Sequence, residues 1–204
     1  MKKLLNLFLA IACCLLPVAC AIPDVPWHEE RSKGADEITT EKKRAAIEHL
    51  IRRTEWTIEK FADDRAFASR QPYDVATIEG NLMLNEGINE IWTLVAGGGG
   101  TAYSNANARC GVGDSSAAEA ATQTDLQAAT NKLYKAQNAS FPTTGSQQIV
   151  FKCDFGSSDA NFAWNEFTVD NGSTPSKNLN RKVSSQGTKA SGQTWTLTLT
   201  ITLS

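Results

Sequence analysis

The chain has 204 residues, of which 41% are hydrophobic and 21% are charged, and its formal net charge is −2. This length fits one domain, or one domain with an appendage, and the composition is that of a globular protein. A charge so close to zero argues against a dedicated nucleic-acid binder, which needs a basic surface to displace counterions from phosphates, so we expect no nucleic acid among its partners.

Residues 1–21, MKKLLNLFLAIACCLLPVACA, have the layout of a secretory signal: two lysines, an apolar run and then small residues. Cleavage after this stretch would start the mature chain at Ile22. A lipoprotein signal is the second interpretation, with Cys20 as the lipidated residue, although Pro17 stands where that signal has a leucine. The third is an uncleaved anchor, but the apolar run is shorter than the roughly 20 residues that a membrane span needs.

Charge is unevenly distributed along the rest of the chain. Residues 22–87 contain 10 Lys+Arg and 14 Asp+Glu, whereas residues 88–204 contain 8 of each kind. Such a shift predicts a charged appendage followed by a compact domain. We therefore expect three parts: a signal-like segment (1–21), a charged linker and helix (22–54), and a β-sandwich domain (55–204).

The stretch TTEKKRAAIEHLIRR (39–53) predicts a charged helix. Thr40 can cap it, and Arg52 and Arg53 suit its last turn because cations are favourable near a helix C-terminus. Its apolar face is narrow and consists of Ile47, Leu50 and Ile51. Such a helix either packs on a partner or another copy of itself, or is a solvated surface helix.

Two extended segments should follow. EWTIEKF (55–61) alternates apolar and polar residues and predicts a strand. RQPYDVATIEGN (70–81) predicts a turn and then a second extended piece.

The clearest helix is predicted over residues 85–96, with Asn85 as its cap and Gly97 at its end. Its apolar residues recur at i, i+3, i+4 and i+7, which defines one helical face: Ile88, Ile91, Trp92 and Val95. A face that carries an indole is expected to bury heavily, so this helix should belong to the domain core.

Beyond Gly100 the sequence predicts short strands separated by turn residues. The predicted strands are NARCGVGD, QQIVFKCDF, NFAWNEFTV, NLNRKVSS and TWTLTLTITLS. Strands without long helices between them pair antiparallel, so we expect a mainly β fold, an antiparallel β-sandwich with one packed helix. Residues 115–130, SSAAEAATQTDLQAAT, lack an apolar face and predict a long structured loop.

The last predicted strand alternates threonines with apolar residues, and no charge follows Lys189. Its threonine face is either ordinary solvated sheet or a flat surface that packs on a neighbouring subunit. A long, uncharged strand is rarely left at an open sheet edge. We therefore expect this strand to be central, or covered by another chain.

Two cysteines would remain after cleavage, Cys110 and Cys153, and both fall on the apolar side of their predicted strands. An even pair in an exported chain suggests a disulfide. Two buried free thiols are an equally good interpretation. A bridge requires that the two Cα atoms lie within about 7 Å of each other.

The sequence contains no recognisable catalytic constellation, and we expect no cofactor, no metal and no enzyme activity. His28 and His49 lie in the charged appendage and fit surface histidines. Glu166, between aromatic residues, could be catalytic only opposite a second carboxylate. Pairing with Arg181 or Lys182 is the better interpretation, because a buried acid without a partner is costly.

Other polar residues have equally ordinary interpretations. Asp154, Asp159 and Asp170 lie near turns and could bind calcium, but their spacing is irregular and favours turn formation. Asn138 and Asn171 begin glycosylation sequons, which matter only in a host that glycosylates.

Several motifs in a fixed order resemble a family of uncharacterised structural proteins of tailed bacteriophages. They are EGNLMLNEGINEIWTLVAGGGGTAYSNANARCGVGDSS, TQTDLQAATNKLYKA, ANFAWNEFTVDNG and LNRKVSSQGTKASGQTWTLTLTITLS. The similarity covers about residues 56–204 and extends to the small β domains of phage tail-fibre and tail-collar proteins. The signal-like start, Cys110 and Cys153 depart from the family's pattern and would suit an oxidising compartment.

The resemblance implies a virion structural protein, a tail-fibre, collar or capsid-decoration component. Its partners would be itself, as a homo-oligomer, other virion proteins and a host cell-surface glycan. The alternative is an exported bacterial module of the periplasm, outer membrane or cell surface. In that case Tyr103, Tyr134 or Trp164 could stack on sugar rings. A hydrolase with paired carboxylates is a third class, which no feature of the sequence favours.

Overall fold

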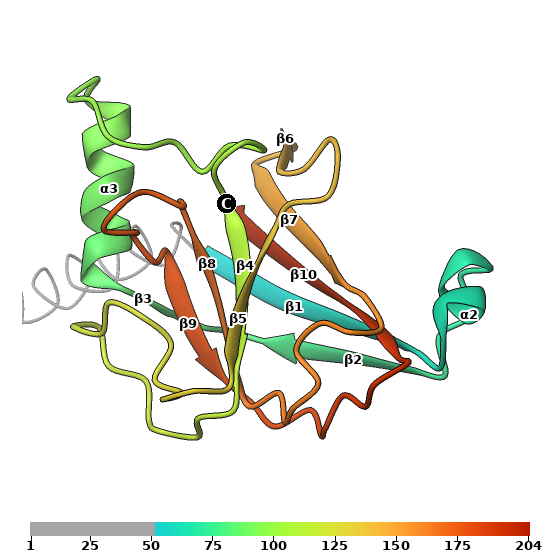
Figure 1. Ribbon diagram of the computed structural model, residues 1–204. Helices are drawn as coiled ribbons and strands as arrows, with labels where there is room; N and C mark the ends of the chain where they lie inside the picture. Colours follow the sequence, from blue (N-terminus) through green and yellow to red (C-terminus); the bar gives the residue numbers. More distant parts are fainter. Residues whose placement is uncertain (1–51) are drawn as a thin grey trace, which may run out of the picture. The chain divides into compact units, whose positions relative to one another are not determined.

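A computed structural model of the protein describes residues 52–204 (Figure 1). In this part of the chain ten strands form two antiparallel five-stranded sheets, which confirms the predicted mainly β sandwich. The predicted signal segment with Cys20, the two histidines and the charged helix up to Ile51 lie outside the described residues.

The first sheet has the strand order β2-β1-β10-β7-β6. Its members are β1 (Arg52–Phe61), β2 (Asp74–Glu79), β6 (Thr143–Gly145), β7 (Gln148–Phe155) and β10 (Thr194–Leu203). The second sheet has the order β3-β9-β8-β4-β5. Its members are β3 (Leu82–Met83), β4 (Arg109–Gly113), β5 (Lys132–Ala136), β8 (Glu166–Asp170) and β9 (Asn180–Val183).

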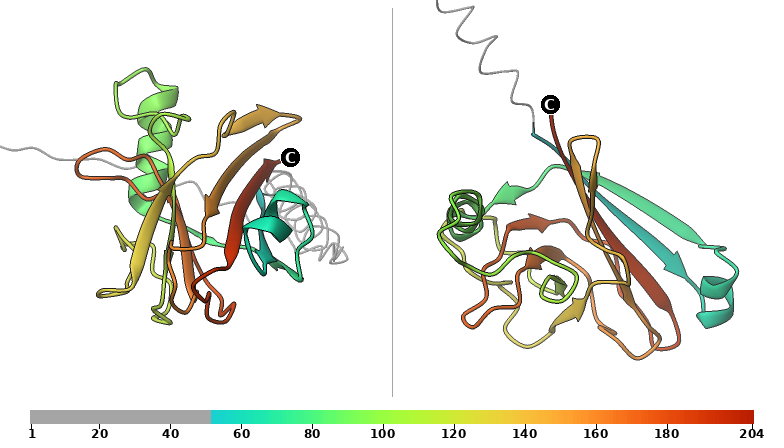
Figure 2. Two further views of the ribbon diagram at one scale, coloured as in Figure 1. Left: turned by 45° about the vertical axis from the view of Figure 1, so that its right-hand side comes forward. Right: turned by 90° about the horizontal axis from the view of Figure 1, so that it is seen from above.

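The C-terminal strand β10 is central in the first sheet, as its lack of charge predicts. It pairs with β1 along its full length and with β7 on its other side, and Figure 2 shows the three strands side by side. Its apolar residues face the core, where Trp195, Leu197 and Leu199 are buried. On the outer face the hydroxyl of Thr196 donates to Glu59 at 3.0 Å.

Aromatic side chains fill the space between the sheets. Trp164 packs edge-on against Phe155 and Trp195, with ring centroids 4.8 Å and 5.0 Å apart. Trp164 precedes β8, whereas Phe167 lies within it, yet both are fully buried in the same core. Edge-to-face contacts of this kind add to the stabilisation from buried area.

Three local predictions need correction or addition. Arg52 and Arg53, predicted in the last turn of the charged helix, instead begin β1 and pair with β10. The short helix α2 (Asp64–Ala68) was not predicted; the side chain of Asp63 caps it by accepting from the amide of Ala66 at 2.7 Å. Strands β3, β5 and β6 were also missed. No helix within residues 52–204 is both long and apolar enough to cross a membrane.

Helix α3 (Asn85–Val95) confirms the clearest predicted helix, and Gly97 follows it with a φ of +67°. The predicted cap was wrong. Leu84 occupies the cap position, makes no side-chain hydrogen bond to the first turn, and is itself fully buried.

The predicted burial of the apolar face of α3 was also wrong. Trp92 is 63% exposed and Val95 is 73% exposed. The helix docks instead through Gly87, which is buried against the backbone of Leu179. Successive residues of an α-helix are about 100° apart, so Trp92 points roughly 140° away from Gly87, whereas Ile91 points only about 40° away from it and is half-buried. Figure 1 shows α3 beside β3 and β9.

The docking contact at Gly87 gives a first prediction. A Cβ atom added there would lie 2.5 Å from the carbonyl oxygen of Leu179 and 2.7 Å from that of Asn178. We expect Gly87→Ala to lower the free energy of unfolding by about 1–3 kcal/mol, because the helix backbone must move away. Urea unfolding followed by tryptophan fluorescence measures this change.

Gly98→Ala is the matched control, because a Cβ atom there would come no closer than 3.4 Å to Thr93. We expect its free energy of unfolding to stay within about 0.5 kcal/mol of the parent value. Equal stability of the Gly87→Ala protein and the parent would contradict the close backbone contact.

Candidate functional site

An apolar pocket with a volume of about 580 Å³ lies between the two sheets. The first sheet contributes β1, β10 and the β6–β7 hairpin to its wall, and the opposite wall comes from β3, α3 and the segments before β4 and β9. Its apolar side chains include Met83, Ile91, Phe151, Leu179 and Ile201. A volume of this size lies within the roughly 300–1,000 Å³ that small-molecule sites occupy. We call this cavity the end pocket.

The β6–β7 hairpin forms one wall of the end pocket, and its turn is tight. Ser146 and Gln147 have φ values of +49° and +63°, the left-handed conformation that two-residue hairpin turns require. The carbonyl oxygen of Gln147 accepts from the amide of Leu203 at 3.0 Å. The turn is therefore tied to the end of β10, and both elements contribute to the pocket wall.

Arg52 is the one charged residue among the described residues that line the end pocket. Its Nη2 atom donates to the carbonyl oxygen of Asn81 at 3.1 Å. Partial burial lowers the pKa of Arg52 from its ordinary value, although a guanidinium remains charged at neutral pH. The pocket thus combines apolar walls with a single cation.

Tyr103 also lines the end pocket, and it is the one predicted sugar-stacking aromatic that does so. Its hydroxyl donates to the carbonyl oxygen of Lys177 at 3.1 Å. Burial raises the pKa of Tyr103, and the nearby carboxylates of Glu90 and Glu86 raise it further. The ring is therefore a neutral, fixed part of the wall.

A second apolar feature lies on the outside of α3. Ile88, Trp92 and Val95 are exposed along one face of the helix, and we call them the α3 stripe. Ile91, on the same helix, lines the end pocket. Helix α3 therefore presents apolar side chains both to the pocket and to solvent.

Glu166, the candidate catalytic acid, is instead a structural anchor. It is fully buried beside Arg181, whose Nε and Nη2 atoms lie 2.8 Å and 2.6 Å from Oε2. The backbone amides of Gln127 and Ala128 donate to the same carboxylate at 2.9 Å and 2.7 Å. Of the two partners considered for Glu166, Arg181 is thus the observed one, and both carboxylate oxygens are in use.

The same ion pair holds the predicted loop of residues 115–130. Arg181 Nη1 donates to the carbonyl oxygens of Ala117 and Ala118, at 3.0 Å and 3.3 Å, and to the side chain of Gln123. The loop contains turns and bends but no helix, as predicted. It is fixed by hydrogen bonds to a buried pair, which explains how a sequence without an apolar face becomes ordered.

Cys110 of β4 and Cys153 of β7 form a disulfide, with their Cα atoms 6.0 Å apart. Because β4 and β7 belong to different sheets, the bond links the two layers of the sandwich. The cysteines are 43 residues apart in sequence, for which the chain-entropy treatment gives a stabilisation of about 4 kcal/mol. The Nε2 atom of Gln137 lies within 3.4 Å of each sulfur.

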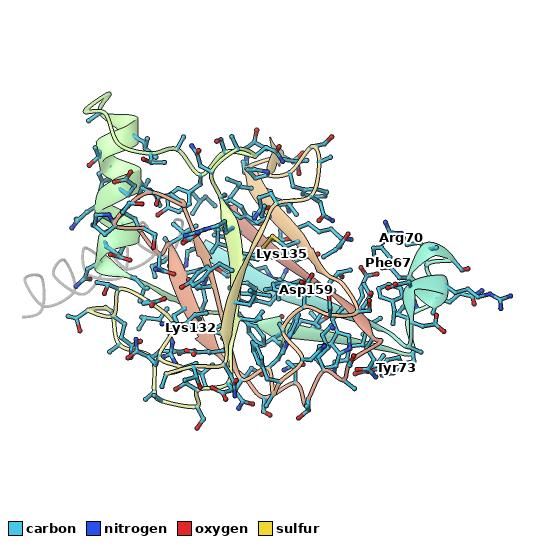
Figure 3. All side chains as sticks on the ribbon, in the orientation of Figure 1. Phe67, Arg70, Tyr73, Lys132, Lys135 and Asp159 are labelled. Carbon is cyan, nitrogen blue, oxygen red and sulfur yellow. A yellow bond between two sulfur atoms is a disulfide. The ribbon has the colours of Figure 1, made fainter. Side chains whose placement is uncertain are left out.

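The aspartates near turns are mostly engaged by cations. Arg109 donates from Nε to Asp170 at 3.0 Å. Lys135 pairs with Asp159 at 2.6 Å, and both residues are labelled in Figure 3. Burial raises the pKa of Asp159, but the hydrogen bonds from Lys135 and from the amide of Gly156, together with the charges of Lys135 and Lys189, outweigh this effect and lower the pKa overall. Within residues 52–204, no group of three or more His, Cys, Asp or Glu side chains could hold a metal ion.

Three other candidate residues are placed where they cannot serve as proposed. Trp164 is fully buried and cannot stack on a sugar. Tyr134 is half-buried and bound through its hydroxyl to Asp125 and Asn178, and the guanidinium of Arg109 lies over its ring, 5.2 Å from the centroid. Asn171, of the second sequon, is buried, and its side-chain amide donates to the carbonyl oxygen of Thr101 at 3.0 Å.

The exposed aromatics were not singled out in advance as surface residues. Trp92 is 63% exposed, and Tyr73, shown with Phe67 and Arg70 near α2 in Figure 3, is 54% exposed. Figures 1 and 2 place α2 and α3 at opposite ends of the domain. These two aromatics therefore mark separate surfaces.

Comparison with known proteins gave no match: no family model, no curated protein and no solved structure matches this chain. The described fold therefore defines the class only as an antiparallel β-sandwich with an end pocket and an exposed apolar helix face.

The buried pair gives a second prediction. Glu166→Gln would leave the buried charge of Arg181 without its counter-ion, so we expect the free energy of unfolding to fall by about 3–5 kcal/mol. Guanidinium unfolding measures the loss. Limited proteolysis should show faster cleavage within residues 115–130, because the loop loses its anchor.

The control is an exposed pair, Arg53 and Glu79, whose closest N–O distance is 3.5 Å. Glu79→Gln should change the free energy of unfolding by no more than about 1 kcal/mol, because solvent screens exposed ion pairs. An equal decrease in the free energy of unfolding for Glu166→Gln and Glu79→Gln would show that the burial of Glu166 does not increase its contribution to stability.

Proposed function

We propose that the protein is a structural component of a bacteriophage particle, of the tail-fibre, collar or capsid-decoration kind, and that it acts through protein contacts. The observation that carries this proposal is the α3 stripe. Most of the large apolar side chains in the described chain are buried in one core, whereas this stripe exposes a tryptophan on a rigid helix. Exposed apolar clusters of this kind are typical of interaction sites, and tryptophan is frequent among residues that dominate binding energy.

The motifs that resemble phage structural proteins support the proposal, because they supply the residues that build this domain. The WNEF motif contributes Trp164 to the core and Glu166 to the buried pair, and LNRKV contributes Arg181. The buried pair of Glu166 and Arg181 is used to hold the fold, which suits a protein whose work is done by its surface.

The proposed partners are a second copy of the chain and other virion proteins, and the location is the virion. A contact that covers the α3 stripe would bury Trp92 at its centre, where residues of high binding energy usually lie. A host cell-surface glycan is a further proposed partner; the exposed ring of Tyr73, at the opposite end of the domain, is available for sugar stacking.

This proposal gives a third prediction. Mass spectrometry of purified particles assigned to the same genome should detect the protein. Trp92→Ala should weaken its self-association or its incorporation by about 30-fold, the loss expected for one dominant interface residue. Sedimentation velocity measures self-association, and peptide counts measure incorporation.

Tyr73→Ala is the control, since Tyr73 is also an exposed aromatic but lies beyond the α3 surface. It should leave assembly unchanged, and both variants should unfold like the parent. Particles of that genome that lack the protein would reject a virion role.

A second candidate function is an exported bacterial binding module, and the disulfide is the observation that favours it. Disulfides persist in oxidising compartments and are rare in the cytosol, where phage particles assemble. The signal-like residues 1–21 point the same way, to the periplasm, the outer membrane or the cell surface.

N-terminal sequencing and a thiol count give a fourth prediction that separates the two candidates. An exported chain should start at Ile22, or at a lipidated Cys20, and Cys110 and Cys153 should resist alkylation unless a reductant is added. A chain that keeps Met1 and has both thiols free would exclude export.

A further inference from the structure

The end pocket has the chemistry of a site for an amphipathic ligand. Its floor and walls are aliphatic and aromatic over most of their area, and the polar groups lie toward Arg52 and the β6–β7 turn. Such a surface offers few hydrogen bonds to a sugar or a nucleotide. An aliphatic chain loses no hydrogen bonds there and leaves water, at roughly 25 cal/mol for each Å² of apolar surface buried.

The charge of the pocket determines which polar group of an amphipathic ligand it can bind. Arg52 is the one ionic group in the described lining, and within residues 52–204 no carboxylate pairs with it. Its neighbour Arg53 differs, because it alternates to the other face of β1 and pairs with Glu79. A guanidinium at the pocket edge that has no counter-ion within residues 52–204 is complementary to a carboxylate, which it can bind through two parallel hydrogen bonds.

Unpartnered polar atoms lie beside Arg52 in the structure. The hydroxyl of Thr54 and both side-chain polar atoms of Asn81 are buried without a hydrogen-bond partner. Thr54 is two residues from Arg52 on the same face of β1, it is 4% exposed, and it pairs in register with Ile201 of the pocket wall. The carbonyl oxygen of Asn81 accepts from Arg52. Neither Thr54 nor Asn81 is among the residues that line the end pocket, so Arg52 remains the one charged group that the described wall offers to a ligand.

We propose that the end pocket binds a fatty-acid-type molecule, a long aliphatic chain that ends in a carboxylate. The carboxylate pairs with Arg52, and the aliphatic chain lies along Ile149, Leu179 and Ile201 between the sheets. This site is separate from the α3 stripe and does not depend on a role in a virion.

The experiment is an equilibrium titration of the purified full chain with dansyl-labelled undecanoic acid, followed by fluorescence. Three competitors with the same chain length then displace the probe: dodecanoate, dodecanol and dodecyltrimethylammonium. We expect dodecanoate to compete at least about tenfold better than the cationic compound, because only the anion can pair with Arg52.

Arg52→Gln should weaken dodecanoate binding by about tenfold and leave dodecanol binding unchanged, since only the charged contact is lost. Arg53→Gln is the matched control: it removes the neighbouring arginine on the opposite face of β1 and should change neither ligand. Ile149→Trp should abolish binding of all three compounds by filling the pocket. Thr144→Trp, at an exposed hairpin position that also lines the pocket, serves the same purpose without disturbing the core.

Circular dichroism and the thiol count show whether each variant is folded. Equal affinity for the anionic and cationic compounds, or binding that survives both tryptophan variants, would overturn the proposal. So would a chain that binds none of the compounds but self-associates through this face, with Ile149→Trp or Thr144→Trp breaking the dimer. In that case the occupant of the pocket is a second copy.

Discussion

The fold depends on one buried ion pair, between Glu166 of β8 and Arg181 of β9. Neither side chain is exposed, and each also binds backbone groups of the loop formed by residues 115–130. Removing two charges from water is expensive, and their mutual attraction compensates only when the remaining hydrogen-bonding sites are filled. The loop fills them, so the pair and the loop require each other. This interdependence explains how the first residue of β8, Glu166, can be charged and fully buried.

Residues 115–130 cover part of the second sheet, whereas the outer face of the first sheet and helix α3 are covered less completely. The first sheet leaves its threonine-bearing outer face partly open, and only some hydroxyls there, such as that of Thr196, bind neighbouring side chains. The docking of α3 is fixed by a glycine, which allows close backbone contact at Leu179 but adds no side chain to the core. The apolar side chains of α3 are therefore divided between the end pocket and solvent.

The sequence was sufficient for features that depend on local periodicity and insufficient for those set by distant contacts. Strands β7 and β10 alternate strictly, and α3 repeats with helical spacing, so each could be located. The orientation of α3 could not, because it is set by the contact of Gly87 with Leu179, which lies far away in the sequence. Strand β5 was missed because its side chains are half-buried and mostly polar. The end pocket could not be foreseen, because its wall combines segments from Arg52 to Leu203.

The position of α3 joins the two candidate sites physically. Ile91 lines the end pocket and Trp92, the next residue, belongs to the α3 stripe. Adjacent residues of an α-helix are held in a fixed position relative to each other, so a ligand that displaces Ile91 would displace Trp92 as well. The helix is held to the domain mainly by the Gly87 contact and by hydrogen bonds such as that from the amide of Asn178 to Glu86 at 2.6 Å. Because Gly87 lies directly against the backbone of Leu179, moving α3 would cost free energy, so the pocket wall at Ile91 and the exposed surface at Trp92 are coupled through one rigid helix.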